Sequence, residues 1–199
     1  EFETVIFKSI KDGESDLTLE DFALSFPNSA FMPEIDDHFY SLVEQAPDEA
    51  NMDKYVNLFP EGKHIDDVKL KLEDAKYKKI IETGSAKLIM DFIEKFPESK
   101  RIKNLTITAT ADSADLLVSD MSDVKIISSK CPLTMKAVEA TTLKLEVLHI
   151  GYKPSVSEYQ VTAEKDQTCR IKLEAKVTSV HVDNFEGTSM WEYKGQYNN

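Results

Sequence analysis

The first half of this sequence repeats one short phrase three times: an aromatic residue, a second aromatic four residues later, a proline, and then a serine or glycine two residues on. The three copies are Phe22-x-x-x-Phe26-Pro27-x-Ser29, Tyr55-x-x-x-Phe59-Pro60-x-Gly62 and Phe92-x-x-x-Phe96-Pro97-x-Ser99. Residues four apart share one face of a helix, and a proline directly after the second ring ends that helix. The phrase therefore predicts an array of helical hairpins, an architecture that usually presents a binding surface rather than performing chemistry.

The register of the phrase supports this prediction. The prolines are 33 and 37 residues apart, and apolar residues follow each of them at the fifth and eighth positions. These apolar pairs are Met32 and Ile35, Ile65 and Val68, and Ile102 and Leu105. We expect Ser29 and Ser99 to cap the helix that follows each turn. The pattern resembles the tetratricopeptide-like repeats of bacterial envelope assembly proteins over about residues 1–105, and the resemblance implies a partner-binding scaffold that has no catalytic residue.

The helices can be placed from apolar spacing and capping signals. We expect helices over residues 2–10, from a Thr18–Asp21 capping box to Phe26, over 31–45 and over 50–59. A longer helix is expected from Ile65 to Gly84, and Ser85 is expected to cap a last helix whose final turn ends near Asn104. These elements make up a predicted helical domain, residues 1–104.

The period of the apolar pattern changes to two after Leu105, which predicts strands. The alternating residues are Leu105, Ile107 and Ala109, then Leu116 and Val118, then Val124 and Ile126, then Leu143, Leu145 and Val147. Short strands at close spacing favour a small antiparallel β-sandwich. The predicted fold is therefore α+β with two domains, the second covering residues 105–176.

Several residues of this second half resemble a PEGA domain. Pro132 and Leu133 match its Pro-Leu element, and a strand of alternating Leu and Val follows at 143–147. Gly151, Tyr152 and Pro154 match its Gly-Tyr turn, and Gln167 and Thr168 match the entry to its last strand. The chain departs from that pattern at Glu139-Ala140-Thr141, where the family has a Pro-Ala-Gly type of turn, and it lacks the family's Asp-Gly in the second strand. The resemblance implies a noncatalytic surface or adhesion module.

Residues 177–199 form a tail that has two open interpretations. Its last residues, from Trp191 and Tyr193 to Asn199, resemble the opening of a MORN repeat. The alternative is a polar tail that frays in solution. Trp191 and Tyr193 are our candidates for a partner-binding contact.

Charge and hydropathy exclude some classes of partner. The chain of 199 residues has a net charge of −12, which repels phosphate backbones, so we expect no nucleic-acid partner. A basic protein partner is compatible with this charge. We expect no transmembrane segment, because no apolar run approaches the roughly 18 residues that would span a bilayer. The two cysteines, Cys131 and Cys169, leave open either a disulfide or two free thiols.

Candidate catalytic groups are sparse. Asp36-Asp37-His38 and His64 with Asp66 and Asp67 have the chemistry of metal ligands. Both clusters fall in early helical turns, where carboxylates favour the helix dipole and face water, so we expect no metal and no cofactor. His149 and His181 are isolated, and no phosphate-binding glycine loop or Gly-x-Ser-x-Gly motif occurs. The protein is therefore not expected to be an enzyme.

The sequence favours two functions over a third, metal-dependent hydrolysis at the His/Asp clusters, which would require a bound metal. The first is a noncatalytic protein-interaction scaffold or adhesion module of a bacterial envelope-associated protein, located in the cell envelope or periplasm, with the cytoplasm as the alternative. The second is a regulatory or recognition segment of a larger multidomain enzyme whose catalytic part lies outside this chain. The sequence specifies neither the partner nor the oligomeric state.

Overall fold

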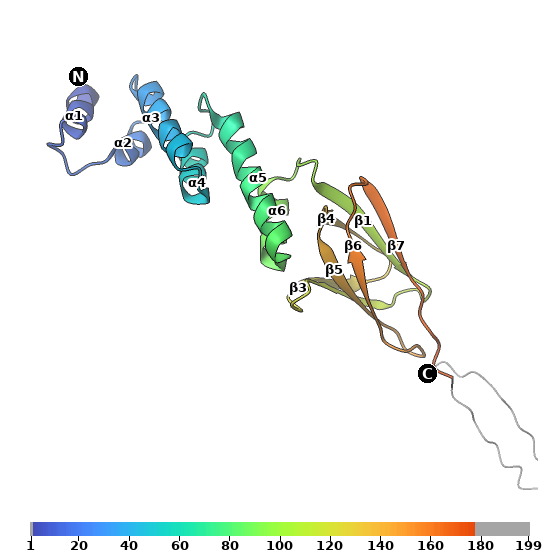
Figure 1. Cartoon of the computed structure of the whole chain (residues 1–199). Coiled ribbons are helices and arrows are strands. Elements are labelled where there is room, and N and C mark those ends of the chain that lie inside the picture. The colour runs from blue at the N-terminus through green and yellow to red at the C-terminus, as the bar shows by residue number, and fades with distance from the viewer. Residues whose placement is uncertain (1, 178–199) are drawn as a thin grey trace, which may run out of the picture. The chain divides into compact units, whose positions relative to one another are not determined.

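The computed structural model describes residues 2–177, and within them six helices are followed by seven strands (Figure 1). The predicted α+β class is thus confirmed. Contacts within the chain group the residues into two compact units, one up to Lys78 and one from Lys79 onward, so the division falls inside a helix. None of the helices in the described range is both long and apolar enough to cross a membrane.

The helices lie close to their predicted positions. They are α1 (Phe2–Lys11), α2 (Leu19–Ser25), α3 (Met32–Gln45), α4 (Glu49–Leu58), α5 (Ile65–Thr83) and α6 (Ala86–Lys95). The capping box at α2 is present: the Asp21 N–H donates to Thr18 Oγ1 at 3.1 Å, and the Thr18 N–H donates to Asp21 Oδ2 at 2.9 Å. In the first compact unit, the buried aromatic rings pack across helices, for example Phe7 against Phe22 with ring centroids 5.3 Å apart.

The repeated phrase folds into the same turn three times. Its two rings lie 4.9, 5.3 and 5.1 Å apart in the three copies. The second ring residue ends each helix with φ between −132° and −125°, and its N–H still donates to the carbonyl of the first ring residue. The residue three positions later then donates to the carbonyl of the second ring residue at 2.9–3.0 Å. The sequence pattern therefore encodes a turn, and this turn does not depend on the element that follows it.

The structure corrects four of our predictions about helix ends and caps. The third turn leads into strand β1 (Ile102–Ala109) rather than into a helix, so helical structure ends at Lys95 and not near Asn104. Neither predicted serine caps a helix: Ser29 Oγ accepts from the Phe31 N–H at 3.4 Å and Ser99 Oγ from the Arg101 N–H at 3.2 Å, both inside the turns. Ser85 precedes α6 but makes no side-chain cap either.

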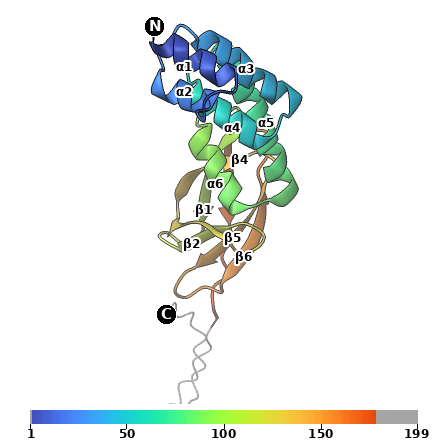
Figure 2. The ribbon, with the colours of Figure 1, turned by 90° about the vertical axis from the view of Figure 1, so that its left-hand side faces the viewer.

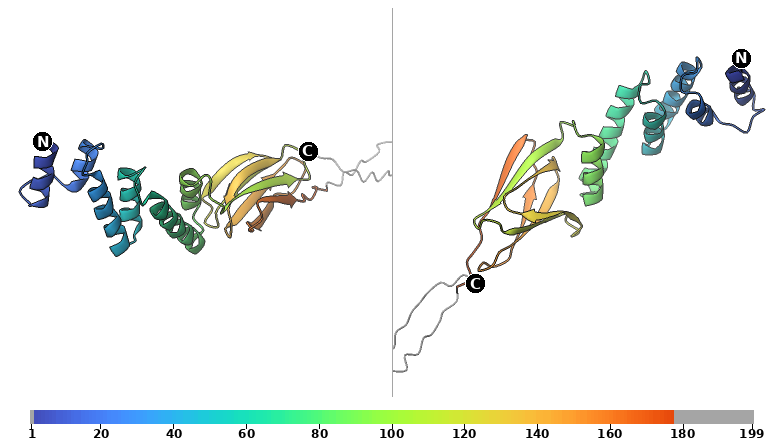
Figure 3. Two further views of the ribbon diagram at one scale, coloured as in Figure 1. Left: turned by 90° about the horizontal axis from the view of Figure 1, so that it is seen from above. Right: turned by 180° about the vertical axis from the view of Figure 1, so that it is seen from behind.

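The strands form two sheets. They are β1 (Ile102–Ala109), β2 (Asp115–Ser119), β3 (Lys125–Lys130), β4 (Leu133–Val138), β5 (Thr142–Leu148), β6 (Ser155–Gln160) and β7 (Asp166–Ile171). One sheet has the order β4-β1-β7 and the other β3-β2-β5-β6. Every neighbouring pair is antiparallel except β1 and β7, which run parallel, so the predicted all-antiparallel arrangement is wrong for that pair. Figures 2 and 3 show these strands from further sides.

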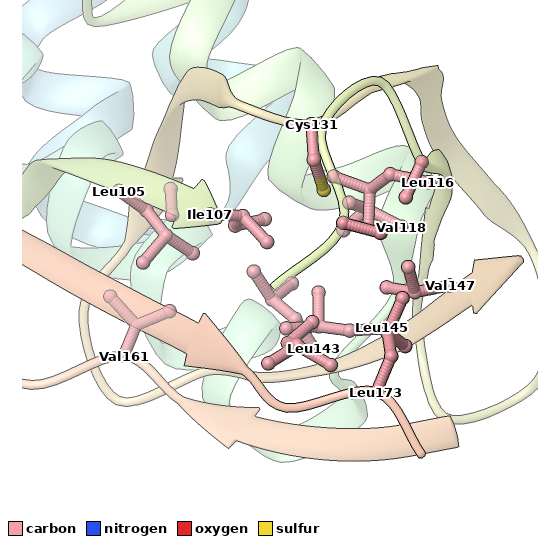
Figure 4. Packing of buried hydrophobic residues seen from close by; sticks show 14 residues of the cluster. Leu105, Ile107, Leu116, Val118, Cys131, Leu143, Leu145, Val147, Val161 and Leu173 are labelled. Carbon is pink, nitrogen blue, oxygen red and sulfur yellow. The ribbon is translucent and has the colours of Figure 1, made fainter. Parts of the chain in front are cut away.

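Both sheets contribute to one apolar core. Leu105 and Ile107 of β1 point into the same cluster as Leu116 of β2 and Leu145 of β5, and each is at most 1% exposed (Figure 4). Alternate residues of these strands are buried, as the period of two predicted. Cys131 lies in this core and Cys169 packs against it, and both are free thiols.

Helix α6 is attached to the strands by a carboxylate. Asp120, which follows β2 and is 3% exposed, accepts a hydrogen bond from the Ala86 N–H at 2.8 Å through Oδ2. Its Oδ1 accepts from the N–H groups of Ser122 and Val124, each at 2.9 Å. Asp120 thus supplies the cap that Ser85 was predicted to supply.

Candidate functional site

The candidate site lies in the first compact unit, where two of the repeated turns border a groove. Its volume is about 580 Å³, which falls in the range typical of ligand pockets. Its lining comes from the first turn and the start of α3, and from the end of α4 and the second turn. The lining residues are Pro27, Asn28, Met32, Pro33, Asp36, Asp37, Leu58, Phe59, Pro60, Glu61, Gly62 and Lys63.

Asp36 is a buried residue that lines this groove and links neighbouring elements. It is 6% exposed and accepts a hydrogen bond from the Tyr55 hydroxyl. Its other carboxylate oxygen accepts from the Lys63 N–H at 2.8 Å, and the Tyr55 hydroxyl oxygen accepts from the His64 N–H at 3.2 Å. Burial and the hydrogen bond to Asp36 raise the pKa of the Tyr55 phenol above its usual range, so the phenol stays protonated and donates. The carboxylate thus joins α3 to α4 and to the second turn.

Our expectation that both His/Asp clusters face water is therefore wrong for Asp36. A carboxylate can be buried when hydrogen bonds satisfy its oxygens, and here a phenol and a backbone N–H do so. Asp37, the next residue, is exposed as expected.

A second network lies on the exposed side of Asp37. His64 Nε2 is 2.9 Å from Asp37 Oδ1, and Lys63 Nζ is 3.3 Å from the same oxygen. The hydrogen bond from His64 makes the largest contribution to lowering the pKa of Asp37, and the hydrogen bond from Lys63 lowers it further. The His64 ring stacks on Tyr40 at 3.8 Å. The two clusters, 27 residues apart in sequence, are thus brought together at this surface.

The network continues along α5 through charged groups. The Tyr40 hydroxyl donates to Asp67 Oδ2 at 2.9 Å, and Lys71 Nζ lies 2.9 Å from the same carboxylate. Lys71 also donates to Glu44. The hydrogen bond from Lys71, then that from Tyr40, lowers the pKa of Asp67, and the bond to Asp67 raises the pKa of Tyr40. Every carboxylate of this chain of contacts is thus balanced by a donor.

The geometry does not build a metal centre from these residues. Across residues 2–177, no three or more His, Cys, Asp or Glu side chains are grouped so as to hold an ion. His38 is exposed with its ring against Phe39, and His149 contacts the Ile150 carbonyl at 2.8 Å. Asp66 is exposed. The candidates Trp191 and Tyr193, the MORN-like segment and His181 lie outside the described residues.

Sequence reasoning missed Tyr55, Gly62 and Tyr40. A signal for the first two was present in the aligned phrases, because the middle copy has Tyr55 where the others have Phe, and Gly62 where the others have Ser. A Cβ atom at Gly62 would lie 2.8 Å from the Tyr55 hydroxyl oxygen and 2.9 Å from Asp36 Oδ2. The glycine therefore leaves room for the hydroxyl and the carboxylate. Nothing in the sequence places Tyr40 against His64.

The negative charge of the chain is concentrated in the unit that holds the groove. Residues 1–78 contain 19 Asp and Glu against 8 Lys and Arg, a net charge of −11. Residues 79–199 contain 17 against 16, a net charge of −1. Residues 1–78, which include α1 to α4 and most of α5, are therefore strongly acidic. Residues 79–199, which include α6 and the strands, are nearly neutral.

Comparison with known proteins adds no relative: no protein-family model and no curated protein matches this sequence.

Proposed function

We propose that this chain is a noncatalytic protein-interaction scaffold whose acidic helical part docks a basic protein partner. The observation that carries the proposal is the charge difference between the two units, −11 against −1. A surface of one sign attracts partners of the opposite sign and raises their association rate. The groove between the repeated turns gives this surface a concave, partly apolar place for contact.

The proposal includes two domains with separate tasks. The helical domain, residues 1–104 with tetratricopeptide-like repeats, binds the partner through its acidic residues 1–78. A PEGA-like β-sandwich over residues 105–176 serves as a spacer or adhesion module. The recurrence of one turn geometry supports the repeat assignment, and the single core shared by both sheets supports the sandwich. Association with the bacterial cell envelope is also proposed, on the sequence resemblances alone.

A capture experiment tests this function. The whole chain is immobilised, incubated with native lysate of the organism that makes it, and compared with a globular control protein of similar size and net charge. We expect reproducible capture of a basic protein by this chain and not by the control. The capture should weaken at about 0.5 M salt, because salt screens contacts between exposed charges. Repeated absence of any partner specific to this chain would contradict the proposal.

A further inference from the structure

The groove between the first and second repeated turns has apolar walls that are open to solvent. Pro27, Pro33 and Pro60 are exposed, and Met32 and Leu58 are partly exposed. Prolines lose little conformational entropy when another molecule covers them, because their backbone φ is already fixed. The walls can therefore receive an apolar side chain of a ligand at low entropic cost.

The charged groups of the groove favour a cation. Three carboxyl groups, on Asp36, Asp37 and Glu61, line it against one ammonium group, on Lys63. The Asp37 side chain is 58% exposed and Glu61 is exposed, so both can be reached from solvent. Asp36 is committed to Tyr55 and the Lys63 N–H. Asp37 and Glu61 are thus the two carboxylates that a ligand can contact.

The ion pair between Lys63 and Asp37 does not block this contact. Its charged atoms are 3.3 Å apart, and the two side chains are 71% and 58% exposed. Exposed pairs of this kind are weak and readily exchange partners. A cation of the ligand can therefore take the place of Lys63 beside Asp37, while His64 Nε2 keeps its contact of 2.9 Å with Asp37 Oδ1.

We propose that this groove binds a segment of a partner protein in which a lysine or arginine neighbours an apolar residue. The apolar side chain packs on Met32, Pro33 and Pro60, and the cation pairs with Asp37 and Glu61. This inference rests on the proposed scaffold function and assigns the docking site for the basic partner.

Two labelled peptides of equal charge test the site on the whole chain. One alternates leucine with lysine and the other alternates serine with lysine, and binding is followed by fluorescence anisotropy at fixed salt. The leucine–lysine peptide should bind more tightly, because only its apolar side chains use the proline and methionine walls. Equal affinity for both peptides would overturn the inference.

Variants with the same change in net charge separate the groove from general attraction. Glu61→Lys places a cation in the groove, whereas Glu14→Lys makes the same change at an exposed position that does not line it. We expect Glu61→Lys to lower the affinity for the leucine–lysine peptide roughly tenfold, because like charges in contact repel each other. Glu14→Lys should lower this affinity no more than about twofold. Both variants should keep the melting temperature of the parent chain.

Equal weakening by Glu61→Lys and Glu14→Lys would overturn the inference, because binding would then follow net charge alone. The proposed scaffold function fails by a different result, the absence of any specific partner in the capture experiment. If a captured basic partner stays bound to the Glu61→Lys chain, the scaffold function stands and the groove is not its site.

Discussion

At the scale of single residues, the middle copy of the repeated phrase shows how one substitution requires another. Tyr55 carries a hydroxyl that the equivalent Phe22 and Phe92 lack, and that hydroxyl donates to the buried carboxylate of Asp36. Gly62 has no side chain and therefore leaves space for both groups, whereas the other two copies have serine at this position. Tyr55, Asp36 and Gly62 thus form one unit of packing and hydrogen bonding.

A double-mutant cycle tests the coupling between Tyr55 and Gly62. Gly62→Ser should lower the free energy of unfolding by about 1–3 kcal/mol, because its Cβ would lie within 3 Å of Phe59 Cβ, Tyr55 and Asp36. Part of that loss should be absent in a Tyr55→Phe background, where the hydroxyl is gone. Urea denaturation of the four proteins measures the interaction. Strict additivity of the two changes would show that glycine and hydroxyl are independent.

The two cysteines give a second prediction at this scale. Burial raises the pKa of the Cys131 thiol. Burial is also the main reason why the pKa of the Cys169 thiol is raised, and the charge interaction with Cys131 adds to it. A raised pKa leaves less thiolate, the form that reacts. Titration with a thiol reagent at pH 7 without reductant should find two thiols in the unfolded protein, reacting much more slowly in the native state. Recovery of no thiol after unfolding would instead show a disulfide.

At the scale of elements, Asp120 contributes to the attachment of α6 through its hydrogen bond to the Ala86 N–H. Burial opposes ionisation of this carboxylate, but hydrogen bonds from the N–H groups of Ala86, Val124 and Ser122 outweigh it, so its pKa is lowered. A carboxyl group with a lowered folded pKa stabilises the protein above its unfolded pKa, and the contribution is lost as the pH falls through the folded value. Asp120 therefore contributes fully at neutral pH and progressively less below about pH 4.

Asp120→Ala tests this attachment. We expect a loss of about 1–3 kcal/mol at pH 7, since three N–H groups lose their acceptor, and a smaller difference from the parent in strongly acidic solution. Thermal unfolding followed at pH 7 and pH 3 measures both. Ser119→Ala is the matched control, because the neighbouring Ser119 hydroxyl is buried with no hydrogen-bond partner within residues 2–177, and its removal should be neutral or stabilising. Similar losses for both variants at pH 7 would argue against a specific cap.

Elements set by local signals were predictable, and elements set by distant contacts were not. The turn at each proline follows from residues within one helical turn, so all three copies could be placed. The turn at Ser99 does not indicate whether a strand or a helix follows. The alternation of apolar residues from Leu105 and their packing in the strand core determine that a strand forms. The cap of α6 comes from Asp120, which is 34 residues away from Ala86 in sequence, so no local pattern predicts it.

The same distinction applies to the candidate site. Asp36, Asp37 and His64 could be named from their chemistry, but their assembly depends on the packing of α3 against α4 and α5. Whether Asp36 faced water or the interior depended on the Tyr55 hydroxyl, which lies 19 residues further along the chain. The sequence could therefore supply the residues of the site but not its geometry.

At the scale of the whole molecule, the account rests on the unequal distribution of charge. The chain resembles an ordinary acidic protein when its net charge of −12 is taken alone. The division into units shows that residues 1–78 carry −11 of it. A basic partner should therefore be attracted to residues 1–78 rather than to the rest of the chain.

Zero-length crosslinking of the captured complex tests this claim most directly. Carbodiimide joins a carboxylate to a lysine only where the two are in contact, and mass spectrometry then identifies the joined residues. The account predicts that lysines of the partner are joined to acidic residues up to position 78, with Glu61 among them. Crosslinks that fall mainly on carboxylates after Lys79 would contradict it.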